Sequence, residues 1–186
     1  MAQGQESKCT SWTIGVTAIV IMIGIFAPLA WYAERPADTT YEATITSVGG
    51  LDPALDLHGD RQALSPVFGI TVRVDSTRNK VFKKRIGGAG SSVVVSYGDA
   101  LLAKGAVPEL CVHTSGVGEV AAEAWGLNVQ VPQFLRDRLA GEIESGQAVV
   151  DVAVRTPVGC YINGCLDAVL VCKARIQGGS SPCFSM

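Results

Sequence analysis

Hydrophobic and polar residues alternate along much of the chain after residue 39. The alternation is clearest in 67–75 and recurs in 40–48, 93–97, 148–155 and 166–174. A period of two places successive side chains on opposite faces, which predicts half-buried β-strands. Asn163-Gly164, between the last two segments, is typical of a two-residue hairpin turn.

One segment has a helical period instead. Leu135, Leu139 and Ile143 recur every four residues, with Pro132 before them and Gly146 after them, which predicts a short helix from Pro132 to about Ser145. Residues 117–131 fit either a helix or a strand that ends at Gly126. Several strands with one short helix predict an all-β domain, namely an antiparallel β-sandwich of the immunoglobulin or fibronectin III type. We expect this sandwich over 40–176 and a flexible C-terminal tail over 177–186.

The N-terminal region carries a long apolar segment. Between Lys8 and Glu34 no residue is charged, and a helix needs about 20 apolar residues to cross a bilayer. Trp12 lies at one end of the segment and Trp31 and Tyr32 at the other, as in the aromatic belts at membrane interfaces. The pattern predicts a transmembrane helix over 12–33, after a cytosolic tail (1–11) and before a linker (34–39). A cleaved signal peptide and a buried core helix are the alternatives.

The flanking charges indicate the orientation. Each flank of the apolar segment has one Lys or Arg, and the free amine of the short tail favours a cytosolic N-terminus. Residues 34–186 would then lie outside the cytosol, with the lipid bilayer contacting 12–33. Cys9 next to the apolar segment is a candidate for palmitoylation, or a thiol without a role.

Composition excludes two classes of protein. The chain has 186 residues, 48% hydrophobic and 17% charged, with a net charge of −2. Intrinsically disordered chains are poorer in apolar residues and richer in charge. A protein that binds nucleic acid by electrostatics usually carries a high pI, so we expect no nucleic-acid partner.

Cysteines suggest disulfides but do not fix their pairing. Beyond the apolar segment lie Cys111, Cys160, Cys165, Cys172 and Cys183, which in an oxidising compartment could form two disulfides and leave one thiol. Buried unpaired cysteines are the alternative. A turn at Asn163-Gly164 would put Cys160 opposite Asp167, which disfavours a bridge between Cys160 and Cys165.

No motif for catalysis, cofactor binding or metal binding is found. The two histidines, His58 and His113, lack partner motifs, and HExxH, GxSxG and P-loop patterns are absent from the sequence. Lys83, Lys84 and Arg85 are part of the densest positive cluster. This cluster could contact anionic lipid or an acidic partner, or it could be an ordinary solvated surface.

Three segments carry a resemblance to a known family. LSPVFGITVRVD (64–75), VVVSYGDALLAKGAVPELC (93–111) and VPQFLRDRLAGEIESGQAVVDVAV (131–154) resemble the late embryogenesis abundant subgroup 2 domain, in particular the plant NHL-type (harpin-induced-like) membrane proteins. Many relatives follow the first strand with an Asn-Pro-Asn turn, whereas this chain reads VDSTRN at 74–79. The resemblance implies a β-sandwich outside the cell at the plasma membrane and a role in defence or stress response, and it supplies no catalytic residues.

These observations favour a non-enzymatic, single-pass membrane protein whose β-sandwich serves as an interaction module for an unknown protein partner. A lipid-binding or membrane-contact domain is the second hypothesis. A hydrolase with an unrecognised site is the third.

Overall fold

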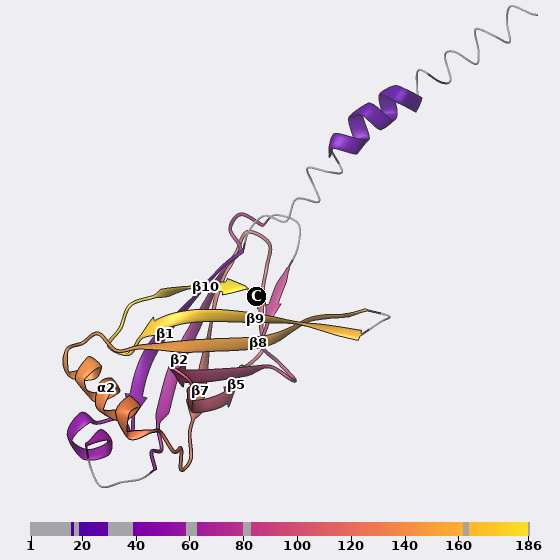
Figure 1. The fold of residues 1–186 in the computed structure, drawn as a ribbon. Coiled ribbons are helices and arrows are strands. Elements are labelled where there is room, and N and C mark those ends of the chain that lie inside the picture. Colours follow the sequence, from indigo (N-terminus) through magenta and orange to yellow (C-terminus); the bar gives the residue numbers. More distant parts are fainter. Residues whose placement is uncertain are drawn as a thin grey trace, which may run out of the picture. The chain divides into compact units, whose positions relative to one another are not determined.

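Figure 1 shows the fold in a computed structural model. The structure describes residues 16, 19–29, 39–58, 63–79, 83–161 and 164–185, with the backbone alone for 158–161 and 164–167. The chain divides into two units, Met1–Ala37 and Asp38–Met186, which we consider separately.

In the first unit, Val16 and residues 19–29 are helical. At 1.5 Å per residue, 19–29 covers about half of the ~30 Å hydrocarbon core of a bilayer. Within the described residues, no helix is both long enough and apolar enough to cross a membrane. This finding corrects the prediction of a transmembrane helix over 12–33. Trp12, Trp31, Tyr32 and Cys9 lie outside the described residues.

The second unit is built mainly from strands. Their bounds are β1 (Thr40–Gly49), β2 (Val67–Asp75), β3 (Lys84–Ile86), β4 (Ser92–Tyr97), β5 (Ala100–Ala106), β6 (Leu110–Val112), β7 (Val117–Trp125), β8 (Val149–Tyr161), β9 (Gly164–Arg175) and β10 (Ser181–Ser185). The five predicted strand segments correspond to β1, β2, β4, β8 and β9. The ambiguous segment after residue 117 is the strand β7.

Among the described residues, eight strands form a closed barrel in the order β1-β10-β9-β8-β4-β5-β7-β2. Every neighbouring pair in this barrel is antiparallel, and β2 pairs with β1 to close it. The predicted β-sandwich is therefore wrong, although the all-β antiparallel class with a short helix is confirmed. Alternation shows which face of a strand is buried, and both a sandwich and a barrel bury one face of every strand.

The strand that closes the barrel comes from the segment predicted to be a flexible tail. β10 pairs Tyr41 with Cys183 on one side, and Cys183 with Cys172 on the other. It therefore joins β1 to β9, which would otherwise be two free sheet edges. Its short sequence, SPCFS, has no clear alternation of apolar and polar residues, so the period of two gave no signal there.

The barrel interior is filled by apolar side chains, most clearly those of β2, β4 and β8. Phe68, Ile70, Val72 and Val74 of β2 are almost completely buried, and the same is true of Val93 and Val95 of β4 and of Val150, Val152 and Val154 of β8. Such a core is typical of small barrels, whose inward side chains leave no wide channel.

A helix packs beside the barrel. α2 (Gln133–Glu144) confirms the predicted helix, and Leu139 and Ala140 are its buried residues. A short π-helical turn, η1 (Pro53–Leu57), contacts α2. Asp52 caps this turn by accepting hydrogen bonds from the backbone N–H groups of Ala54 and Leu55. Figure 1 shows both helical elements at the same end of the barrel.

The hairpin between β8 and β9 differs from the prediction in its register. Tyr161 pairs with Gly164, so the two connecting residues are 162 and 163 rather than Asn163 and Gly164. Cys160 consequently lies opposite Cys165, not opposite Asp167. The register shifts between Pro157 and Gly159, where proline lacks the N–H that a regular ladder needs.

Candidate binding surfaces

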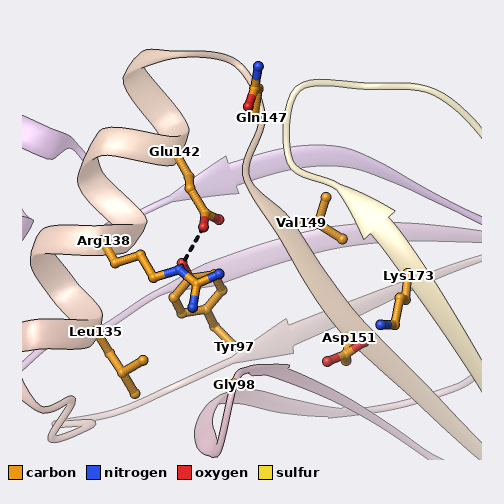
Figure 2. A pocket seen from close by; sticks show the side chains of 9 residues that line it. All are labelled: Tyr97, Gly98, Leu135, Arg138, Glu142, Gln147, Val149, Asp151 and Lys173. Atoms are coloured by element: carbon orange, nitrogen blue, oxygen red, sulfur yellow. Dashed lines mark hydrogen bonds and ion pairs between the residues drawn. The ribbon is translucent and has the colours of Figure 1, made fainter.

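A cleft of about 370 Å³ lies between α2 and the barrel wall (Figure 2). Its lining comes from α2, from the ends of β4 and β8, and from β9. The residues are Tyr97, Gly98, Leu135, Arg138, Glu142, Gln147, Val149, Asp151 and Lys173. The cleft exists because α2 packs its apolar side, with Leu139, toward the barrel and leaves its charged side at the rim.

Arg138 and Glu142 form the centre of this rim. Arg138 Nε donates a hydrogen bond of 2.9 Å to Glu142 Oε1, as expected for residues one helical turn apart. The Arg138 guanidinium carbon lies 5.9 Å from the centre of the Tyr97 ring, which is within cation–π range. The pair thus covers the aromatic ring from the helix side (Figure 2).

Tyr97 carries an unusual hydroxyl group. The residue is 5% exposed, and among the described residues its hydroxyl has no hydrogen-bond partner of ordinary geometry. Burial raises the pKa of Tyr97, the nearby Glu142 carboxylate raises it further, and Arg138 partly opposes the shift. A tyrosine with a raised pKa keeps its proton at neutral pH, so it can donate a hydrogen bond but cannot serve as a base.

The cleft is lined by charged groups of both signs. Its charged groups are two cations, Arg138 and Lys173, and two anions, Glu142 and Asp151, and Asp151 lies opposite Lys173 in the backbone register of β8 and β9. The lining contains no Ser, Cys or His that a neighbouring group could activate as a nucleophile or base. Such a set of donors and acceptors can hold a small polar molecule by hydrogen bonds.

The predicted basic cluster is partly neutralised. Lys84 and Arg85 lie on β3, which pairs with β6 in a small separate sheet, and Lys83 precedes it. Arg85 Nη2 lies 2.9 Å from Glu109 Oε2. Because one of the three cations is paired with a carboxylate, the cluster is a weaker anion-binding surface than the sequence predicts.

The cysteines divide into three groups. Cys172 and Cys183 form a disulfide between β9 and β10. Cys111 is an exposed free thiol whose Sγ lies 3.7 Å from Glu109 Oε1. Cys160 and Cys165 lie opposite each other in the backbone register, so the register that disfavoured a bridge between them was wrong. Among the described residues, no group of three or more His, Cys, Asp or Glu side chains could hold a metal ion.

A second surface lies on the outer wall of the barrel, where β2, β7 and β5 are neighbours. Val67, Trp125 and Lys104 lie side by side in this wall, because Trp125 pairs with Val67 on one side and with Lys104 on the other. Trp125 is 64% exposed, and Leu127 just after it is 79% exposed. Beside Trp125 is a hollow of about 590 Å³. We call this region the Trp125 surface, comprising Val67, Leu101, Lys104, Trp125, Leu127 and Arg155.

Sequence reasoning missed both surfaces. The Arg138–Glu142 pair was visible as an i,i+4 pair of opposite charges, but nothing in the sequence placed it over Tyr97. The outward position of Trp125 could have been predicted from the alternation of residues on β7. On β7, Val120, Ala122 and Ala124 are buried, so the odd-numbered Trp125 faces outward.

Comparisons with known proteins do not identify a family. No family model matches the chain, and neither the search of curated proteins nor the search of solved structures finds a significant match. The resemblance to the late embryogenesis abundant subgroup 2 domain therefore stays a prediction.

Proposed function

We propose that this chain is a non-enzymatic interaction module that works outside the cytosol. The observation that carries the proposal is the disulfide between Cys172 and Cys183, which links the closing strand β10 to β9. Disulfides persist in oxidising compartments and are rare in cytosolic proteins.

The distribution of side chains supports a role in binding. The barrel interior is packed with apolar residues, so a partner has to be bound on the outer wall. There the structure has a mixed-charge cleft beside α2 and the Trp125 surface. Defence or stress response, which the resemblance implies, is the setting we propose for this module.

Labelling of intact cells tests the proposal. We would express the full chain with a C-terminal tag and treat the cells with an amine-reactive biotin reagent that does not cross membranes. We expect the chain to be labelled on intact cells, or recovered from the medium, because solvent-exposed lysines such as Lys104 would be accessible to the reagent. Labelling that appears only after permeabilisation, as for a cytosolic marker protein, would contradict the proposal.

A further inference from the structure

The Trp125 surface concentrates apolar side chains that protrude from the barrel. Val67, Leu101, Trp125 and Leu127 are 46%, 53%, 64% and 79% exposed. They belong to the start of β2, the start of β5 and the end of β7, which are neighbours in the barrel. Strands β5 and β7 approach closely here, since a side chain added at Gly126 would meet the backbone oxygen of Leu102. Large apolar side chains that are exposed together on neighbouring strands indicate a contact surface.

Positive charge lies beside these apolar groups. Lys104 is the direct cross-strand neighbour of Trp125, and Arg155 lines the same hollow together with Ser91 and Ser92. The closest acidic residue on this part of β7 is Glu123, two positions from Trp125 and opposite Gly69 and Ala106 in the backbone register. The hollow itself contains no carboxylate, so it favours an anionic group.

We infer that the Trp125 surface docks onto a lipid bilayer that contains anionic headgroups. This inference rests on the proposed function and names the partner of the interaction module. Trp and Leu would enter the interfacial region, where tryptophan is favoured because one part of its ring system is apolar and its N–H is polar. Lys104 would face the anionic headgroups.

The shape of the surface favours a bilayer over a protein partner. Trp125 and Leu127 are 64% and 79% exposed, and on a protein partner each would need a matching pocket, because hot-spot side chains fill well-packed pockets. A fluid interface can accept projecting side chains without a matching cavity. The surface is also distinct from the predicted cluster at Lys83–Arg85, in which Arg85 is paired with Glu109.

Fluorescence of Trp125 tests the inference directly. The chain has three tryptophans, so a full-chain W12F/W31F variant leaves Trp125 as its single tryptophan. We would mix it with phosphatidylcholine vesicles, with or without phosphatidylserine, that carry bromine on the upper acyl chain. We expect bromine to quench Trp125 emission, and to quench it more strongly when phosphatidylserine is present. Emission that is unchanged by brominated lipid overturns the inference, even if the chain binds vesicles through another segment.

Vesicle sedimentation gives the strength of the contact. Burying most of a large apolar side chain corresponds to about a tenfold change in partitioning, so W125A and L127A should each weaken binding about tenfold. K104A should weaken it about fivefold on anionic vesicles at low salt, and less at high salt. F184A is the matched control, because Phe184 is 70% exposed on β10, which is not a neighbour of β2, β5 or β7.

The outcomes separate the two proposals. Equal binding by W125A, L127A and F184A would overturn the docking surface and leave the interaction module outside the cytosol intact. Loss of a protein partner in W125A without any effect on vesicles would also overturn the bilayer assignment. Far-UV circular dichroism, together with mass spectrometry of the Cys172–Cys183 disulfide, would show that each variant has folded.

Discussion

Removing the disulfide between Cys172 and Cys183 should destabilise the barrel by an amount that its loop size sets. The two cysteines are 11 residues apart. On the chain-entropy model, a loop of this size restricts the unfolded state by about 2.8 kcal/mol at 25 °C. Cys172 is fully buried, so its replacement by alanine adds a cavity cost of up to about 1 kcal/mol. We therefore expect the C172A/C183A variant to lose about 3 to 4 kcal/mol of unfolding free energy.

The short ladders of β10 indicate that the loss of stability would be greatest in this strand. β10 is paired through three residues to β1 and through three residues to β9. These ladders are short, so β10 should separate from β1 and β9 more often without the covalent link. Hydrogen exchange of the backbone amides of β10 should therefore increase more than that of β2, which has long ladders on both sides.

The assays are urea unfolding, which gives the free energy, and thermal unfolding, which gives Tm, both followed by far-UV circular dichroism. Both proteins would carry C111A, because the exposed thiol of Cys111 could otherwise exchange with the disulfide. For a domain of this size, the expected loss lowers Tm by roughly 6–16 °C. If the two proteins unfold within about 1 °C of each other, the disulfide does not hold the barrel closed and the reasoning is refuted.

Four further predictions concern Tyr97 in the cleft, the barrel wall and the helix. Y97F removes a buried hydroxyl that has no ordinary hydrogen-bond partner among the described residues. In urea unfolding at pH 7, the variant should be as stable as the wild type or more stable by up to about 1 kcal/mol. A loss above about 1 kcal/mol would show that the hydroxyl is well bonded. The pKa of Tyr97 is raised from its ordinary value of 10.0, so above about pH 10 the unfolded state releases this proton while the folded state retains it. The stability of the wild type should therefore fall as pH rises above this value. The stability of Y97F should fall less steeply. G105A would place a methyl group against the backbone oxygen of Glu123 and should cost more than about 2 kcal/mol in thermal unfolding. The control G90A should cost about 1 kcal/mol, because nothing lies close to the added carbon although φ is +83°. Equal losses would contradict the β5–β7 pairing. L139A removes a fully buried side chain of α2 and should cost about 2–5 kcal/mol, and a loss below about 1 kcal/mol would show that α2 does not pack on the core.

The sequence predicted the local elements better than their assembly. The inward faces of β2, β4 and β8 followed from alternation, because burial of one face leaves a direct trace in the order of residues. The helix α2 followed from Leu135, Leu139 and Ile143 at helical spacing. Closure of the barrel left no such trace, since it depends on β10 pairing with β1 across most of the chain.

The candidate surfaces, too, were predictable in their local features but not in their assembly. That Trp125 faces outward can be deduced from the phase of β7, once β7 is known to be a strand. Its position between Val67 and Lys104 depends on two non-local registers, and the covering of Tyr97 by Arg138 depends on how α2 packs. The register of the β8–β9 hairpin was mispredicted: the turn signal of Asn163-Gly164 places the turn one residue too late, and the shift between Pro157 and Gly159 left no signal in the sequence.

The redox state of Cys172 and Cys183, measured in the full chain from its own cells, decides whether this barrel is closed by a disulfide. Acid quenching, alkylation before and after reduction, and mass spectrometry would report each thiol separately. We predict that Cys172 and Cys183 are recovered as one disulfide-linked pair and that Cys111 is alkylated before reduction. Alkylation of both Cys172 and Cys183 before reduction would contradict a disulfide-closed module that works outside the cytosol.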